Sequence, residues 1–413
     1  MLRRLNIARV LGVIRQSGPM TRQEIGLISG LSKPTINEAV DVLASKGLIL
    51  IEKSEDTNSV RPGPRAQKIF YHSQRKRVIG IDLGGSKIRL LMTDLNGEEL
   101  TSVRVSTPLQ GGRKAIIQAI RDLVLETLAS HEMQMYDVGA IVVGTPGIID
   151  PNTGMVSVAP QLPEWENFSL SHELYKILGT EVIVENEAHL AVYGENWRGG
   201  AQNLRDVAVM SIGVGIGLGL LIDGKVYRGF NGGAGEIGNL PLSGHFPTSY
   251  PPIGTYEFYT GAAGIERNFE LGRNEFKAKY LLNLAKGGRV TAESIYRAFN
   301  EKDPFSIELV SHQLESIALG IASVCCIVNP EVFIITGGLA PALEPHIEAI
   351  SAIVRKFAPV TPRIILSALD DLAPAFGALR ISIEDVERRT LQTILSGELE
   401  VDQRQSQIPS GEK

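Results

Sequence analysis

Cysteine is scarce in this chain of 413 residues, which contains only Cys325 and Cys326. The two are neighbours in an apolar stretch with a helical pattern, where they cannot easily bridge each other. We therefore expect both thiols to fill core, and no disulfide framework of the kind that secreted domains use. This favours a protein of the cytoplasm.

Long hydrophobic runs are also lacking. The longest uncharged apolar stretch, residues 210–222, contains four glycines and is too short to cross a membrane. The start of the chain carries Arg3 and Arg4 but continues into a mixed amphipathic helix without a cleavage site, so we expect no export signal. The sequence thus predicts a soluble cytoplasmic protein with no membrane partner.

Positive charge is in deficit overall, since 41 Lys and Arg oppose 46 Asp and Glu and give a net charge of −5. Nothing global therefore points to nucleic acid. The first 77 residues differ, because they contain 14 Lys and Arg but only 6 Asp and Glu. This local excess predicts a basic N-terminal domain on an acidic body, as in many DNA-binding proteins.

The N-terminal residues have the pattern of three helices and a hairpin. Apolar residues recur at helical spacing in residues 6–15, Thr21 and Glu24 have capping-box spacing, and Ser32 opens a third helix with Pro34 in its first turn. Residues 47–51 and 66–71 then read as paired strands around a polar loop. This arrangement resembles a winged helix-turn-helix, in which the second helix of the motif lies in the major groove.

On the third helix, short polar side chains face outward and can reach base edges or phosphates. Two arginines of the polar loop would lie in or beside the wing. The candidate DNA-binding residues are Ser32, Lys33, Thr35, Asn37, Arg61 and Arg65. The alternative for this region is a small helical oligomerisation domain with a solvated basic face.

Two stretches of the body share one pattern of apolar run, glycine cluster, apolar run and glycine turn: residues 78–94, VIGIDLGGSKIRLLMTD, and residues 207–225, VAVMSIGVGIGLGLLIDGK. Glycine-rich hairpin turns can bring backbone N–H groups to a phosphate, and Asp82 is suited to hold a metal-bound water beside it. The candidate phosphate-binding residues are Asp82, Gly84, Gly85, Ser86, Gly213 and Gly215. Two such hairpins facing a cleft predict a two-lobed sugar kinase-like fold.

The domain boundaries follow from composition. We expect a winged helix-turn-helix domain at residues 1–71, a basic linker at 72–77, a two-lobed α/β effector domain at 78–385, and a further helix with a disordered tail at 386–413. Strands that alternate with helices place the effector domain in the α/β class.

Several motifs of the body occur together in the order found in one family. They are VIGIDLGGSKIRLLMTDLNG, VVGTPGIIDPNTGMV, APQLPEW, VENEAHLAVYGE, GAGEIG and NPEVFIITGGL. With its N-terminal winged helix the chain resembles a ROK transcriptional regulator over nearly its whole length. The resemblance implies a ribonuclease H-like, actin-type fold, a sugar in the cleft between the lobes, and a homodimer or homotetramer.

The resemblance also assigns site residues. Glu236, Glu257 and Asn186 match sugar-binding positions, while Gln161 and Asn239 replace the family's Asn and His there. Glu187, at the position of the family's base, completes the candidate sugar-binding set. We expect sugar binding to be kept with altered specificity.

Three departures concern catalysis and metal. Glu187 stands where the family's kinases have the catalytic Asp, so the position of the base is degenerate, and Val214 replaces a phosphate-binding Thr. The family's zinc site is also lost, because Asn239 replaces its His and residues 243–255 hold no Cys and only His245. We expect no zinc and no other cofactor.

Three functions remain open. The leading hypothesis is a sugar-responsive repressor that binds operator DNA as a homodimer or homotetramer and does not phosphorylate its sugar. The second is a bifunctional regulator that keeps sugar kinase activity with ATP and Mg²⁺, with Glu187 as base. The third is a ligandless scaffold that binds DNA constitutively, against which the retained sugar-site residues argue.

Overall fold

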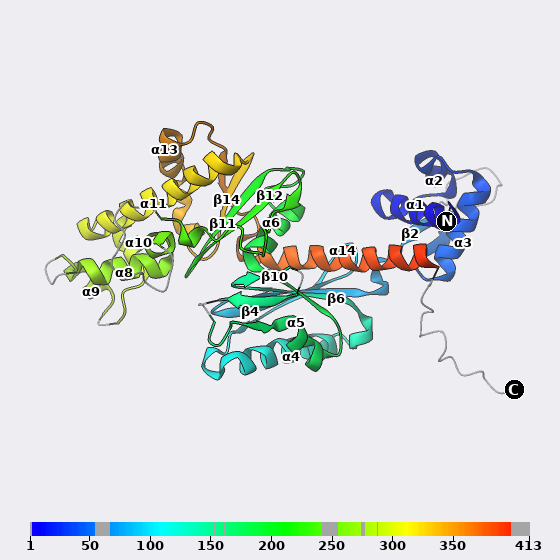
Figure 1. Cartoon of the computed structure of the whole chain (residues 1–413), viewed down its shortest axis with the longest axis horizontal. Helices are drawn as coiled ribbons and strands as arrows, with labels where there is room; N and C mark the ends of the chain where they lie inside the picture. Colours follow the sequence, from blue (N-terminus) through cyan, green and yellow to red (C-terminus); the bar gives the residue numbers. More distant parts are fainter. Residues whose placement is uncertain are drawn as a thin grey trace.

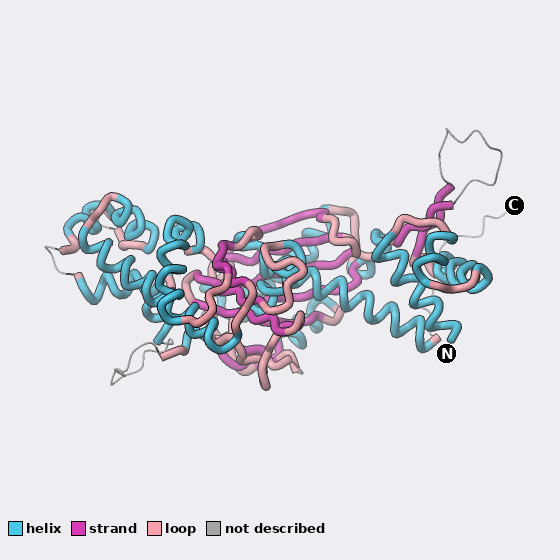
Figure 2. Tube along the Cα trace, turned by 90° about the horizontal axis from the view of Figure 1, so that it is seen from above, coloured by secondary structure: helices cyan, strands magenta, loops and turns pink. Residues whose placement is uncertain are grey.

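The computed structural model describes residues 2–53, 67–151, 153–159, 162–241, 255–273, 277–286 and 288–397. The molecule has three parts along its long axis: a small, mainly helical region at one end and two lobes that each contain a β-sheet (Figures 1 and 2). The long red helix of Figure 1 connects the lobes with the N-terminal region.

The N-terminal region contains three helices and a two-stranded antiparallel sheet. The elements are α1 (Leu2–Ser17), α2 (Arg22–Ser29), α3 (Lys33–Ser45), β1 (Ile49–Lys53) and β2 (Gln67–Tyr71). The expected capping box is present, because Thr21 and Glu24 exchange side-chain and backbone hydrogen bonds at the start of α2. Ile7, Val10 and Ile14 of α1 pack with Ile36 and Val40 of α3 in one core.

The first lobe is built on a five-stranded sheet of order β10-β6-β3-β4-β5. Its strands are β3 (Arg77–Leu83), β4 (Lys87–Thr93), β5 (Glu99–Ser106), β6 (Val138–Thr145) and β10 (Val182–Asn186). Helices α4 (Gly112–Ser130) and α5 (Leu170–Leu178) pack on one face. A small sheet of β7 (Ile148–Ile149), β8 (Met155–Val158) and β9 (Phe168–Ser169) adjoins them.

The second lobe repeats this topology with the order β13-β12-β11-β14-β15. Its strands are β11 (Val207–Ile212), β12 (Ile216–Ile222), β13 (Lys225–Val226), β14 (Val332–Thr336) and β15 (Arg363–Leu366). One face is covered by α7 (Thr255–Thr260), α8 (Ala262–Gly272), α9 (Lys279–Leu284), α10 (Ala292–Asn300), α11 (Pro304–Val328), α12 (Ala340–Leu343) and α13 (Ile347–Phe357).

The repeated hairpin predicted from the sequence is confirmed. In each lobe the first two strands pair antiparallel around a glycine turn, and the first strand pairs parallel with a later strand on its other side. Both glycine turns therefore lie at the carboxyl end of the central strand of a sheet, the end at which open α/β sheets bind ligands.

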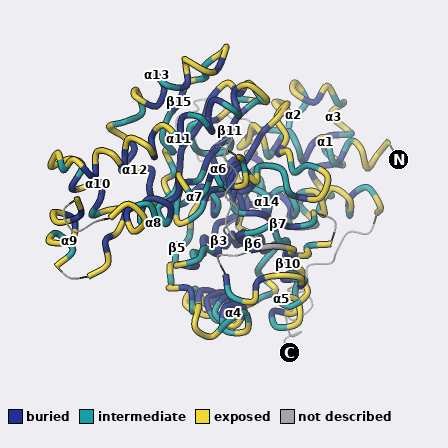
Figure 3. The backbone as a smooth tube through the Cα atoms, turned by 60° about the vertical axis from the view of Figure 1, so that its left-hand side comes forward, coloured by how far each residue is buried: buried dark blue, intermediate teal, exposed yellow. Residues whose placement is uncertain are grey.

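Two helices fill the space between the sheets: α6 (Glu187–Arg198) and α14 (Ala373–Ser396). Helix α6 packs on the second sheet, and α14 packs on β3 and β6 of the first and on α6 itself. The sheets and α6 are the most buried part of the molecule (Figure 3).

Helix α14 corrects the expected division at residue 386. The sequence suggested that the effector domain ends at residue 385 and that a further helix follows, whereas a single helix runs across this boundary from Ala373 to Ser396. Buried Phe376, Ile383, Val386 and Ile394 give this helix a continuous apolar face, and the charged run between them lies on its other side.

The two cysteines have different environments. Cys325 is buried in the core of α11, as expected, but Cys326 is exposed and its thiol lies near the carbonyl of Phe357 (3.7 Å). In the described part of the chain, α11 is the one helix long and apolar enough to cross a membrane, and more than half of that stretch is buried inside the protein. Its packing is that of a core helix.

Candidate functional site

Four carboxylates from four elements converge between the two lobes, where the sequence predicts the cleft. Asp82 lies at the end of β3, Glu187 begins α6, Glu236 precedes the 3₁₀ turn η4 (Ile237–Asn239), and Glu257 belongs to α7. Their charges act on one another: those of Asp82 and Glu236 raise the pKa of Glu187, and that of Glu257 raises the pKa of Glu236. The fold has thus brought together residues that are 175 positions apart in the sequence.

The protonation of this cluster is unusual for carboxylates. Burial, with the charges of Asp82 and Glu236, raises the pKa of Glu187 to about 8. Burial also raises the pKa of Asp82 to about 6, although the charges of Lys87 and Arg89 oppose the shift. Glu187 is therefore mostly protonated at neutral pH and is poorly suited to accept a proton as a general base.

Asn186 has a structural role beside its predicted contact with sugar. Its side-chain oxygen caps α6 by accepting from the N–H groups of Ala188 (2.8 Å) and His189 (3.2 Å), and its Nδ2 donates to the carbonyl of Gly147 (2.8 Å). Among the described residues, these bonds occupy the amide oxygen and one Nδ2 hydrogen, which leaves the second Nδ2 hydrogen as the donor that Asn186 can offer to a sugar hydroxyl.

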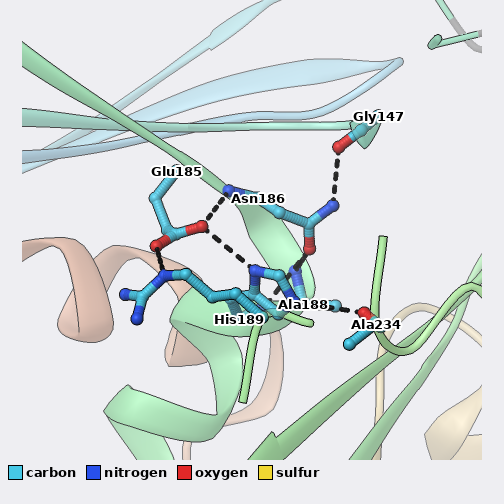
Figure 4. A network of polar contacts seen from close by, with 7 residues as sticks. Gly147, Glu185, Asn186, Ala188, His189 and Ala234 are labelled. Atoms are coloured by element: carbon cyan, nitrogen blue, oxygen red, sulfur yellow. Dashed lines mark hydrogen bonds and ion pairs between the residues drawn. The ribbon is translucent and has the colours of Figure 1, made fainter. Parts of the chain in front are cut away.

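A buried network that sequence reasoning missed holds the loop before Glu236 (Figure 4). Glu185 accepts from Nδ1 of His189 (3.0 Å), from Nε of Arg228 (2.6 Å) and from the N–H of Asn186 (2.9 Å). Nε2 of His189 lies 3.2 Å from the carbonyl of Ala234. The start of α6, which carries Glu187, is thereby tied to the loop that carries Glu236.

The two predicted sugar-binding glutamates lie on the second lobe. Oε2 of Glu257 accepts from the N–H of Ile216 (2.9 Å), just after the second glycine turn. Desolvation raises the pKa values of Glu257 and Glu236, although Glu236 keeps an exposed surface. Asn239 is exposed three residues further on.

Hydrogen bonds within the protein hold both predicted phosphate-binding turns. Thr107 holds the first turn, because its hydroxyl donates to the carbonyl of Gly84 (2.7 Å) and its N–H donates to the carbonyl of Ser86 (3.1 Å). In the second, the N–H of Gly213 donates to the carbonyl of Gly215 (2.9 Å). Val214 is 69% exposed at its tip and offers no hydroxyl to a phosphate.

A family model described as the ROK family matches residues 78–385, about three quarters of the chain. The chain belongs to the ROK family. Among curated relatives, a glucokinase of Halalkalibacterium halodurans is 30% identical over 281 residues, covering 66% of this chain and 85% of its own. A putative xylose repressor of Caldicellulosiruptor sp. is 26% identical over 392 residues, covering 94% and 97%.

A solved structure of a ROK transcriptional regulator, a homologue of the Escherichia coli MLC protein, has the same fold. Its TM-score is 0.74 at 21% identity, and the match covers 97% of this chain and 100% of the other. The predicted actin-like, sugar kinase-type α/β fold of the body is therefore confirmed, together with the recognition of ROK regulators as relatives.

Some predicted site residues lie outside the part of the chain that the structure describes: Gln161, Arg61, Arg65, and His245 with the rest of residues 242–254. On α3, Ser32 and Lys33 are exposed while Thr35 and Asn37 are partly exposed. Among the described residues, no group of three His, Cys, Asp or Glu side chains is arranged to hold a metal ion.

The raised pKa of Glu187 predicts a pH-dependent stability. Between its usual value of 4.5 and about 8, the unfolded chain releases this proton while the folded protein retains it, so the free energy of unfolding falls as pH rises. We expect Glu187→Gln to remove this loss. In calorimetric melting curves, the variant should exceed the natural protein by several degrees above pH 8 and by little at pH 4.5.

The control for this comparison is Glu126→Gln, at an exposed position on α4 away from the cleft. Its melting temperature should follow that of the natural protein at every pH. A difference between Glu187→Gln and the natural protein that is the same at low and high pH would contradict the assignment.

Proposed function

We propose that this ROK protein is a sugar-responsive transcription regulator of the cytoplasm, acting as a repressor, whose cleft binds a sugar or sugar derivative without phosphorylating it. The observation that carries the proposal is the extent of the two matches. An alignment over 94% of the chain has to include most of the N-terminal region, and it is to a repressor. The match to a glucokinase covers only 66%.

The N-terminal region supports DNA binding by its shape and charge. Helix α3 buries Ile36, Val40 and Leu43, which leaves Ser32, Lys33, Thr35 and Asn37 on the side that faces away from the core. In a winged helix-turn-helix these positions would read the major groove, and Arg61 and Arg65 would contact phosphates beside it. A homodimer or homotetramer would then bind an inverted-repeat operator.

The cleft supports binding of a polyhydroxylated ligand. Glu236 and Glu257 offer carboxylate acceptors, Asn239 an exposed amide, and Asn186 one free N–H. Gln161 would add a second amide. Carboxylates and amides that converge between two lobes can pair with the vicinal hydroxyls of a sugar, and here Asn186, Glu236 and Glu257 come from three separate elements.

The same cleft argues against phosphoryl transfer, since Glu187 is mostly protonated at neutral pH and Val214 gives no donor to a phosphate. The alternative is a bifunctional regulator that phosphorylates its sugar with ATP and Mg²⁺. The 30% identity to a glucokinase favours it. We propose no structural zinc in either case, because the loop after Asn239 contains no cysteine.

Thermal-shift screening tests the ligand part of the proposal. The full-length protein is melted with D-glucose, D-xylose and N-acetyl-D-glucosamine, each free and as the 6- or 5-phosphate, and with ATP and Mg²⁺. A sugar that binds the folded state raises the melting temperature in proportion to the logarithm of its concentration above Kd. No shift with any member of a wider sugar panel would favour the ligandless scaffold.

A further inference from the structure

Helix α14 is the only described helix with one end at the cleft and the other in the N-terminal region (Figure 1). Its 24 residues span about 36 Å at the rise of an α-helix. Figure 2 shows from a second direction that this end of the molecule stands apart from the lobes. Few elements other than α14 could therefore transmit a structural change from the cleft to the N-terminal region.

The cleft end of α14 is fixed by direct backbone contact with α6. A Cβ atom on Gly377 would lie 1.9 Å from the carbonyl oxygen of Leu190, and one on Gly194 would lie 2.0 Å from that of Ala373. The two helices thus cross with no layer of side chains between them, so a movement of one displaces the other. Helix α6 begins at Glu187, in the carboxylate cluster.

The segment that leads into α14 is also tied to β4, the strand that follows the first glycine turn. Asp371, two residues before α14 begins, forms ion pairs with Lys87 and with Arg89 (3.1 Å) of β4. Partial burial would raise the pKa of Asp371, but these two cations hold it below its usual value. The first lobe is therefore linked to the residues that lead into α14, while α6 contacts the helix itself.

The far end of α14 is part of the N-terminal region. Ile394, 2% exposed, belongs to the core that α1 and α3 form. Glu387 forms an ion pair with Arg15 (2.6 Å), and Arg4 donates to the carbonyls of Leu395 (2.8 Å) and Ser396 (2.7 Å). Helix α1, which receives these contacts, packs in turn on α3.

We infer that α14 transmits effector binding in the cleft to the DNA-binding surface, and that the Arg15–Glu387 ion pair is the joint through which it does so. A sugar that changes the arrangement of the lobes moves α6, α6 carries α14 with it, and α14 reorients α1 and α3 of each protomer. The inference rests on the proposed function, and it adds the path and the residues of the regulation.

The test measures coupling, defined as the ratio of the DNA dissociation constants with and without the sugar that gives the largest thermal shift. The variants are Arg15→Glu, Glu387→Arg and the double charge swap, each as full-length protein. We expect each single variant to keep its sugar-induced thermal shift. The effect of the sugar on the DNA dissociation constant should be at least fivefold smaller than in the natural protein. The swap should recover it to within about twofold, because it re-forms the pair with reversed sign.

One control and one further variant accompany these measurements. Arg388→Glu reverses a charge on the same helix but at an exposed residue whose partners among the described residues, Asp385 and Gln392, lie within α14, so it should leave the ratio unchanged. Thr390→Val removes the acceptor for Arg75 (2.9 Å) with almost no change of shape, and it should lower the ratio even if a charge-reversal variant fails to fold.

The possible failures are distinct. A ratio of one in the natural protein, with sugar bound, would overturn the proposed function and this inference together. A normal ratio in the natural protein and in Arg15→Glu, Glu387→Arg and Thr390→Val would overturn only the inference. Equal losses in Arg388→Glu would also overturn it, because they would indicate general destabilisation of the helix.

Discussion

Glu187→Asp combined with Val214→Thr is expected to raise ATP-dependent sugar phosphorylation from background to measurable turnover. The shorter carboxylate would move the base back toward the sugar hydroxyl, and a displacement of about an ångström at such a group costs on the order of a hundredfold. The threonine hydroxyl would restore a phosphate donor at the tip of the second glycine turn. A coupled assay of ATP consumption, with the sugar chosen by thermal shift, measures the gain.

The matched control is Glu187→Asp with Val214→Ala, which has the same base and no hydroxyl. It should gain less than the threonine variant, because positioning and charge stabilisation of the phosphate act together. Turnover on the order of 1–100 per second in the natural protein would contradict the proposed loss of phosphoryl transfer. No gain in any variant would mean that the deficit lies in residues other than these two.

Glu236→Ala is expected to weaken sugar binding about ten- to hundredfold and to abolish the thermal shift at moderate sugar concentrations. Hydrogen bonds to a charged group contribute roughly 1.5–3 kcal/mol, and each 1.4 kcal/mol is about tenfold in Kd. The loop that carries Glu236 is held by other contacts: His189 lies against the carbonyl of Ala234, and both His189 and Arg228 bind Glu185. The truncation should therefore not disturb the fold. Titration calorimetry of the full-length protein measures the affinity.

Glu126→Ala on the surface of α4 is the control, and it should bind sugar as the natural protein does. DNA binding by Glu236→Ala in the absence of sugar should be unchanged, since the residue lies in the cleft and not in the N-terminal region. An unchanged sugar affinity in Glu236→Ala would contradict the assignment of the sugar site.

The fold was largely predictable because its signals are local. Two apolar runs around a turn predict each glycine-rich hairpin, and the capping box at Thr21 depends on Glu24 only three residues away. The length of α14 was not predictable, because its charged run near Arg388 resembles a solvated tail. What keeps that segment helical is packing on the N-terminal region, more than 320 residues earlier in the chain, through Ile394.

The site was predictable only in part. The motifs predicted the cleft carboxylates Glu187, Glu236 and Glu257. They did not predict that Asn186 also caps a helix, because this role depends on where β10 ends. Nothing in the sequence around His189 indicated a polar network, because the residue lies on the apolar face of α6. Its partners, Glu185 and the carbonyl of Ala234, become neighbours only when the loop folds back against the helix.

The most direct test of the account is the effect of sugar on DNA binding by the full-length protein. The DNA duplex is obtained by in vitro selection from random sequence, and fluorescence anisotropy gives its dissociation constant with and without the sugar that stabilises the protein most. The account predicts selection of an inverted repeat and a sugar-dependent change of about 5- to 150-fold in that constant. A sugar that stabilises the protein but leaves the constant unchanged, or a failure to enrich any sequence, would contradict it.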